Sequence, residues 1–89
     1  MTMRRGEIWL VDMEPARGSE ADKRRPAVIV SNDGANEAVQ RARRGVITVV
    51  PLTSSIGKVR SFHVLLPARD TGLSVDSKAQ AEQVRAVAI

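Results

Sequence analysis

The stretch Pro26-Ala27-Val28-Ile29-Val30-Ser31 is short, continuously apolar and rich in β-branched residues. Such a run, bounded by turn residues, predicts a strand that is buried on both faces. A second run of the same kind, Val46-Ile47-Thr48-Val49-Val50, follows after a change of period, and we expect Pro51 to stop it. Two buried strands in so short a chain favour a fold built on a β-sheet.

Further strands are expected on both sides of these two runs. Residues 7–13 carry apolar side chains on both faces, residues 62–66 are closed by Pro67, and residues 84–89 begin another strand. Between residues 75 and 82 the pattern alternates strictly. One row consists of Val75, Ser77, Ala79 and Ala81, and the opposite, polar row consists of Asp76, Lys78, Gln80 and Glu82.

One helix is predicted between residues 35 and 45. Its apolar face would consist of Ala35, Ala38, Val39 and Ala42. Asp33 is the candidate N-cap, Glu37 and Arg41 can pair at i, i+4, and Gly45 ends the helix. Because this face is mostly alanine, we expect the helix to be weakly anchored. Five or six short strands, one short helix and no βαβ alternation predict a mainly β fold, a small and mostly antiparallel barrel.

The composition excludes several classes of site. Eighty-nine residues provide for one domain. The absence of cysteine excludes disulfides, thiolate metal sites and a cysteine nucleophile, and the single histidine excludes a zinc cluster of His and Cys. The acidic residues are scattered, so we expect no divalent metal site. The N-terminus lacks the apolar run of a signal peptide and no stretch reaches the length of a membrane span, so we expect a cytoplasmic protein.

The charge distribution favours a polyanionic partner. The formal net charge is +4. The positive residues occur in clusters, namely Arg4-Arg5, Lys23-Arg24-Arg25, Arg41-Ala42-Arg43-Arg44, and Lys58 with Arg60. Such an imbalance points to nucleic acid first. Only Trp9 and Phe62 are aromatic, which argues against a surface that binds single strands by stacking.

Several short motifs follow one another in a recognisable order. The first part of the chain contains Met3-Arg4-Arg5-Gly6-Glu7-Ile8-Trp9, Asp12, Pro15, Gly18-Ser19-Glu20, Arg25-Pro26 and Val28-Ile29-Val30. The later part contains Val49-Val50-Pro51-Leu52-Thr53-Ser54, Asp76-Ser77 and Glu82-Gln83-Val84-Arg85. Taken in this order, over nearly the whole chain, these motifs resemble those of the MazF/PemK/Kid family of endoribonuclease toxins.

The resemblance has definite implications for fold, activity and partners. It implies an SH3-like barrel, a two-fold homodimer, and metal-independent, sequence-specific cleavage of single-stranded RNA such as mRNA. This reaction needs no cofactor and leaves a 2′,3′-cyclic phosphate. The resemblance also implies neutralisation by a cognate MazE-like antitoxin. Residues 1–89 would form one PemK/MazF-like toxin domain, and we expect it to be incomplete at the C-terminus, because the family usually ends in a further helix.

The catalytic candidates follow from what metal-free RNA cleavage requires. A base must take the 2′-hydroxyl proton, the phosphorane must be stabilised, and the 5′-oxygen must be protonated. Arg25 lies between a polar loop and a buried strand, at the position of the family's catalytic arginine. We assign it to phosphorane stabilisation, because a guanidinium gives up a proton reluctantly. Thr53 can donate to a phosphate oxygen, or alternatively bond its own backbone.

Two carboxylates compete for the role of the base. Glu20 lies on the loop that leads to Arg25, whereas Glu82 lies on the polar row near a strand end. Both alternatives stay open, and we favour Glu20 as the nearer partner of Arg25. Candidate RNA-binding residues are Ser19, Lys23, Arg24, Ser54, Lys58, Arg60, Gln80 and Gln83.

Other residues have a structural interpretation, and other functions compete with cleavage. His63 alternates with Phe62 and Val64, so we expect it to face solvent or a rim, and we expect Trp9 in the core or a dimer interface. The first rival function is a non-catalytic toxin of the same fold, similar to the gyrase-targeting CcdB. The second is a basic barrel that binds nucleic acid without cutting it. The third is a truncated toxin that keeps the fold but not the activity.

Overall fold

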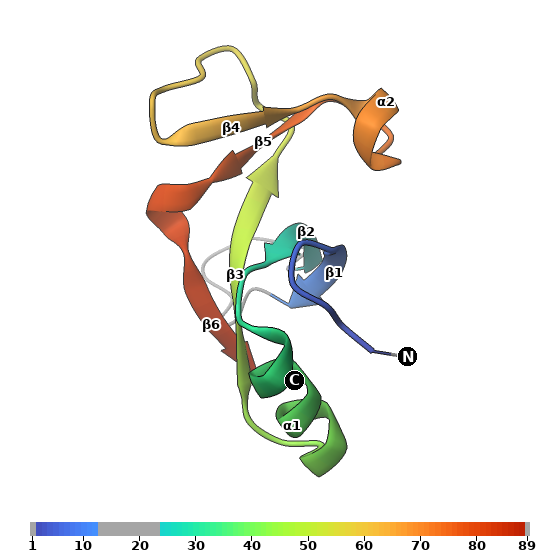
Figure 1. The fold of residues 1–89 in the computed structure, drawn as a ribbon. Helices are drawn as coiled ribbons and strands as arrows, with labels where there is room; N and C mark the ends of the chain where they lie inside the picture. Colours follow the sequence, from blue (N-terminus) through green and yellow to red (C-terminus); the bar gives the residue numbers. More distant parts are fainter. Residues whose placement is uncertain (1, 13–23, 89) are drawn as a thin grey trace.

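Six strands and two helices make up the computed structural model of this chain, which describes residues 2–12 and 24–88 (Figure 1). A short 3₁₀ helix, η1, lies between the last two strands. The elements are β1 (Ile8–Asp12), β2 (Arg24–Ile29), α1 (Asp33–Ala42), β3 (Val46–Thr53), β4 (His63–Leu66), α2 (Ala68–Thr71), β5 (Ser77–Gln80), η1 (Ala81–Gln83) and β6 (Arg85–Ala88).

The long strand β3 organises the sheet because it pairs antiparallel with three other strands. Its middle lies along β2, its first half along β6, and its end along β5. The strand order is β1-β2-β3-β5-β4, with β6 paired to β3 beside this path. The mainly β, antiparallel prediction is confirmed. The described strands do not close into a barrel, however, since short edge strands, β1 and β4, leave the sheet open at both ends.

The hydrophobic core lies where β1, β2, β3 and β6 meet. Alternate residues of each strand point to one face, as the period of two requires. Fully burying a side chain of this size contributes roughly 1.5–3 kcal/mol, so this cluster is the main stabilising element of the fold. Its buried members are Val11, Ala27, Ile29, Ile47, Val49 and Val87, with Met3, Trp9 and Val39 packed against them.

The prediction that Pro51 stops the third strand is wrong, because β3 continues through it to Thr53. Pro51 is buried and lies opposite Ala27 of β2. On the other side of β3, the pairing with β6 ends at Val49 and the pairing with β5 begins at Leu52. Pro51 therefore stands in a gap between two partners, where a missing N–H is tolerated.

The ends of α1 differ partly from the prediction. The N-cap is Asn32, whose side chain accepts a hydrogen bond from the Ala35 N–H at 2.8 Å. Asp33 does not cap the helix; its Oδ1 accepts from the Arg5 N–H at 2.7 Å. The predicted pair of Glu37 and Arg41 is confirmed, at 3.6 Å.

Apart from Val39, which packs against the core, the face of α1 toward the body is polar rather than alanine-rich. Ala35, Ala38 and Ala42 are exposed. Asn36 is fully buried, and its Nδ2 donates to the Ser31 carbonyl at 3.0 Å. The next turn continues this contact: Gln40 Oε1 accepts from the Met3 N–H at 2.8 Å, and Gln40 Nε2 donates to the Met3 carbonyl at 3.3 Å. The helix is therefore anchored by hydrogen bonds, which an apolar periodicity cannot reveal.

The second half of the chain folds back along the end of β3. Pro67 ends β4 as predicted, and the expected turn is the one-turn helix α2. The predicted alternation over residues 75–82 holds only for β5, since η1 begins at Ala81. Lys78 of the predicted polar row is buried, as are its neighbours Ser77 and Ala79. In the described part of the chain, neither helix is long and apolar enough to cross a membrane.

Candidate active site

A surface cavity of about 430 Å³ lies where β2 begins and β3 ends. The strand β5 and the segment that precedes it close its other side. The two residues predicted for phosphate chemistry, Arg25 and Thr53, both line this cavity. The complete lining is Arg25, Pro26, Leu52, Thr53, Ser54, Leu73, Ser74, Val75 and Ser77.

The strand register explains why Arg25 and Thr53 meet. The pairing of β2 with β3 places Ala27 opposite Pro51. Arg25 lies two residues before Ala27, and Thr53 two residues after Pro51. In antiparallel strands these steps lead in the same direction, and a step of two keeps each side chain on the same face. Residues far apart in sequence are thus placed together by main-chain pairing.

The hydroxyl of Thr53 is oriented by a nearby backbone N–H group. Thr53 Oγ1 accepts a hydrogen bond from the Ser55 N–H at 3.2 Å. This is the alternative that the sequence left open, and it does not consume the hydroxyl proton. A hydroxyl has one donor and two acceptor sites, so Thr53 can accept from Ser55 and still donate into the cavity.

The cavity has the chemical character of an anion site. Among the described residues that line it, Arg25 is the only charged one, and hydroxyl groups accompany it on Thr53, Ser54, Ser74 and Ser77. A guanidinium offers five N–H donors in a planar fork that matches a phosphate. Within residues 2–12 and 24–88, no group of three or more His, Cys, Asp or Glu side chains could hold a metal ion.

Comparison with known proteins identifies the family. The sequence model of the PemK-like, MazF-like toxins of type II toxin-antitoxin systems matches residues 4–89. The chain belongs to this toxin family. Endoribonuclease MazF9 of Mycobacterium tuberculosis is 67% identical over 86 residues, which cover 97% of this chain and 73% of that protein. The probable endoribonuclease MazF1 of the same organism is 67% identical over 57 residues, or 64% of this chain and 61% of its own length.

The fold agrees with the sequence comparison. The crystal structure of MazF from Deinococcus radiodurans superposes with a TM-score of 0.71 at 28% sequence identity. The match covers 98% of this chain and 71% of that one. The arrangement of the open sheet is therefore that of a MazF-like toxin.

The remaining predicted residues of this MazF-like toxin lie at several different places. Ser19, Glu20 and Lys23 lie outside the described residues. Ser54 lines the cavity beside Thr53. Arg24, by contrast, is opposite Asp12 and lines a different surface hollow with Leu10 and Val87. Neighbouring residues of a strand point to opposite faces, so Arg24 and Arg25 serve different surfaces.

Glu82 lies in η1 and does not line the cavity. Its Oε2 is 3.3 Å from Nε2 of His63, whose side chain is only 6% exposed. The expectation that His63 faces solvent or a rim is therefore wrong, and the reason is that Glu82 and the loop before β4 cover the ring.

The other candidate RNA-binding residues lie on β5, on η1 and on the loop before β4. Gln80 is opposite His63 in the pairing of β4 with β5. Gln83 Oε1 accepts from Arg85 Nη2 at 3.3 Å and is exposed. Lys58 and Arg60 lie on the loop between β3 and β4 and are exposed. Among the polar residues of the cavity, Ser74 and Ser77 were not predicted, because a serine in a turn or a short strand carries no distinguishing signal.

Proposed function

We propose that this chain is a metal-independent endoribonuclease that cleaves single-stranded RNA by attack of a 2′-hydroxyl on the adjacent phosphate. The observation that supports this most strongly is the shared cavity of Arg25 and Thr53 in a member of the MazF-like toxin family. The name endoribonuclease, carried by the two mycobacterial relatives, agrees with it.

The proposed reaction uses the cavity to bind the phosphate as its charge rises. The 2′-oxygen forms a bond to phosphorus, and the bond from phosphorus to the 5′-oxygen breaks. The leaving 5′-oxygen takes a proton from solvent, so the products are a 2′,3′-cyclic phosphate and a free 5′-hydroxyl. Arg25 and the Thr53 hydroxyl donate to the non-bridging oxygens, which carry the most negative charge in the phosphorane. Donors that are already oriented need no reorganisation at that moment, and this favours the transition state over the bound substrate.

A carboxylate must take the 2′-hydroxyl proton, and we propose Glu20 for this role. The described residues that line the cavity include no carboxylate, and Glu82 is bound to His63. The comparison of Glu20→Gln with Glu82→Gln tests the choice. We expect Glu20→Gln to lower kcat by about 100-fold or more, within the usual contribution of a general base, and Glu82→Gln to lower it by less than about threefold. The reverse result would assign the base to Glu82.

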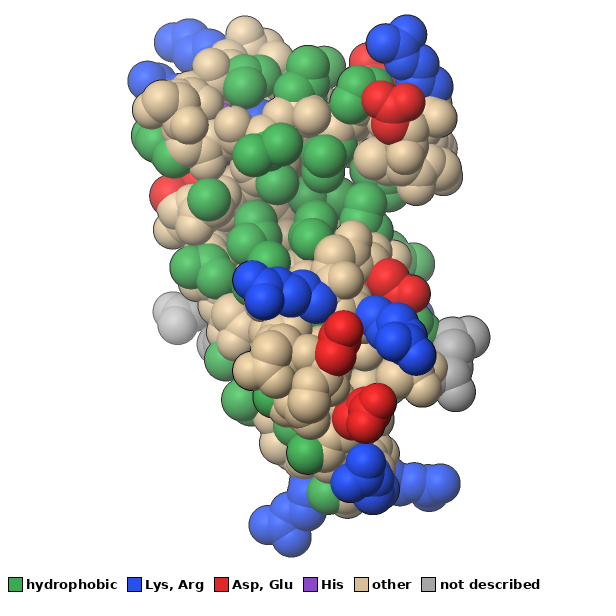
Figure 2. Space-filling view, viewed as in Figure 1, with side chains coloured by type: hydrophobic (Ala, Val, Ile, Leu, Met, Phe, Trp, Pro, Cys, Tyr) green, Lys and Arg blue, Asp and Glu red, His purple; other side chains and the backbone are tan. Residues whose placement is uncertain are grey.

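We further propose that the toxin acts as a two-fold homodimer opposed by an acidic antitoxin segment. Apolar side chains spread over the middle and upper part of the face shown in Figure 2. Leu10, Val64 and Val75 are 59%, 57% and 52% exposed, respectively, which is a large apolar surface for a lone small domain. Sedimentation at micromolar concentration tests this proposal. A monomer that cleaves RNA at the full rate would exclude the dimer from the mechanism.

The activity itself is tested by incubating the protein with an unstructured RNA in excess EDTA. We expect fragments that end in a cyclic phosphate. A gel shift without fragments would support a nucleic-acid-binding barrel, and neither effect would support a non-catalytic toxin similar to CcdB. Activity that appears only after magnesium is added back would refute the metal-independent mechanism.

A further inference from the structure

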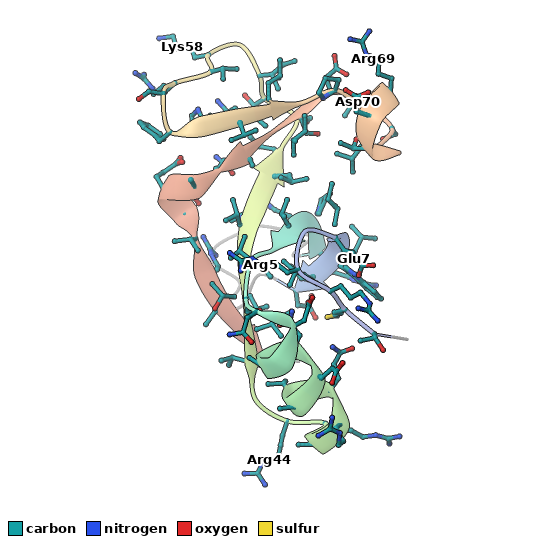
Figure 3. All side chains as sticks on the ribbon, in the orientation of Figure 1. Arg5, Glu7, Arg44, Lys58, Arg69 and Asp70 are labelled. Atoms are coloured by element: carbon teal, nitrogen blue, oxygen red, sulfur yellow. The ribbon has the colours of Figure 1, made fainter. Side chains whose placement is uncertain are left out.

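The loop of residues 54–62, here called the basic loop, joins β3 to β4 directly after Thr53. It carries Lys58 and Arg60, and Figure 3 shows Lys58 at its outer end, beyond β4. The side chains of these two residues are solvent-accessible. No described ion pair involves either of them, so both charges can meet an external anion.

Three hydrogen bonds tie this loop to the sheet beneath it. Lys78 Nζ donates to the carbonyl of Lys58. The Arg60 N–H donates to Nδ1 of His63 at 3.0 Å, and the His63 N–H donates to the Arg60 carbonyl at 2.9 Å. The tethers thus attach to the two residues that carry the loop's positive charges.

The strand register places the supporting side chains on one face. Lys78 of β5 lies opposite Thr53 of β3 and opposite Leu65 of β4. His63 is two residues from Leu65, so its ring projects on the same side as Lys78 and Thr53. The basic loop therefore folds over the face that carries the Thr53 hydroxyl.

The contacts of His63 define its tautomer. A backbone N–H can only donate, so Nδ1 must accept from Arg60 and carries no proton. In the neutral ring the proton is then on Nε2, which donates to Glu82 Oε2. The Phe62 ring and the imidazole pack in a T-shaped arrangement, with centroids 4.6 Å apart. Each polar atom of the buried ring thus has one partner.

We propose that His63, Glu82 and Lys78 are positioning residues that hold the basic loop in a binding-competent shape. Held in this way, Lys58 and Arg60 bind RNA phosphates next to the one cleaved at Arg25 and Thr53. This inference rests on the proposed function for its substrate. It gives Glu82 and the buried Lys78 a role that the cleavage chemistry leaves unassigned. An ordered loop binds RNA more tightly because less of its conformational freedom is lost on binding.

The first experiment needs no RNA. His63 is the only histidine of the chain, so a two-dimensional ¹⁵N–¹H spectrum of the imidazole reports on it alone. We expect the signals of the Nε2–H tautomer in the wild type near pH 8. In Glu82→Ala we expect a weaker preference for this tautomer, because Nε2–H loses its acceptor while the Arg60 N–H still donates to Nδ1. A ring protonated on Nδ1, or one that exchanges equally between the tautomers in the wild type, would overturn the proposal. This result is independent of whether the protein cleaves RNA.

The second experiment measures kcat and KM on a single-stranded RNA. Loss of one hydrogen bond that orders the loop is expected to raise KM about fivefold in His63→Ala and in Lys78→Met, with kcat within twofold. His63→Asn can keep an acceptor near the position of Nδ1 and should restore most of the wild-type KM. His63→Gln keeps a donor near Nε2 but lacks that acceptor, and should not.

Salt dependence separates the proposed role from a general loss of structure. Each phosphate contact to single-stranded RNA contributes about 0.7 to the slope of log binding constant against log salt. Lys58→Ala/Arg60→Ala should therefore lower the slope by about 1.4, and adding His63→Ala to it should change KM no further. The loop-positioning role is refuted if His63→Ala still raises KM about fivefold in the background without the two loop charges. It is also refuted if the single variant His63→Ala melts at a much lower temperature and His63→Asn does not rescue KM.

Discussion

Replacing Arg25 by alanine removes the only charged group among the described residues that line the cavity. A charge-assisted hydrogen bond contributes about 1.5–3 kcal/mol, and a guanidinium can form two such bonds with one phosphate. The cavity is open to solvent and Arg25 is exposed, so the lower end of this range applies to each bond. Two bonds then stabilise the transition state by about 3 kcal/mol, which corresponds to a loss of about 150-fold in kcat.

The assay is single-turnover cleavage of a fluorescently labelled RNA, with three variants compared. Arg25→Ala should lose about 150-fold, and Arg25→Lys should fall between it and the wild type, because an ammonium keeps the charge but not the planar fork. Arg44→Ala removes an equal charge at the end of the molecule away from Lys58 (Figure 3) and should stay within about twofold. Because Arg25 is exposed, its replacement should change the free energy of unfolding by less than about 0.5 kcal/mol.

Two outcomes would refute this reasoning. Retention of more than about a tenth of the wild-type rate in Arg25→Ala would show that the guanidinium does not face the phosphorane. An equal loss in Arg44→Ala would show that overall charge, rather than the geometry of the cavity, controls the rate. A kcat loss confined to Arg25→Ala, with an unchanged melting temperature, is the result that the structure predicts.

Four further changes have defined expected outcomes. Thr53→Val should lower kcat about tenfold or more while Thr53→Ser keeps most of the rate, since only valine removes the hydroxyl donor; equal losses in the two variants would contradict this. Asn36→Leu should lower the free energy of unfolding in urea by about 2–3 kcal/mol, because the Ser31 carbonyl and hydroxyl lose a fully buried partner. An unchanged free energy of unfolding would show that the site can rearrange. Arg43→Gly should stabilise the protein by about 0.5–1 kcal/mol, because Arg43 adopts the left-handed conformation that glycine favours (φ 59°). A lower melting temperature would show that the loss of the Arg43 charge at the helix end outweighs this conformational gain. The pKa of Glu7 is held below its ordinary value of 4.5 by hydrogen bonds from the Trp9 side chain and the Arg4 N–H. Glu7 should therefore stabilise the fold above pH 4.5 and lose this contribution as the pH falls through its folded pKa. A pKa of Glu7 at or above 4.5 in an NMR titration would refute the shift.

The strands were predictable because their residues combine two independent signals. Residues 26–30 of the β2 region and residues 46–50 of β3 are mostly apolar and rich in β-branched side chains, and Ile29, Ile47 and Val49 lie in the core. The end of β4 at Pro67 was also predicted correctly, because Pro67 has no N–H to donate to the neighbouring strand. Where propensity, hydrophobicity and turn chemistry agree, sequence alone determines the local structure.

The errors arise where a polar group finds a tertiary partner. The buried face of α1 contains Asn36 and Gln40, whose hydrogen bonds to Ser31 and Met3 are invisible to an apolar pattern. Lys78 is buried because the basic loop supplies a carbonyl for its ammonium group. The alternation of residues 75–82 predicts only that Lys78 belongs to a polar row, and it does not indicate that a loop covers this side chain. A polar residue can be assigned to surface or interior only after the chain that covers it is known.

The site illustrates the same division between local and tertiary information. Arg25 and Thr53 could be proposed from their positions at strand ends, but only the pairing of β2 with β3 brings them to one cavity. For Glu82, position was not enough: a carboxylate at a strand end was a reasonable base, yet its oxygen lies on the His63 ring. Glu82 Oε2 already accepts a hydrogen bond from the ring, and Glu82 does not line the cavity that holds Arg25 and Thr53. The contact that makes Glu82 useful for holding the basic loop therefore makes it less suited to removing the 2′-hydroxyl proton.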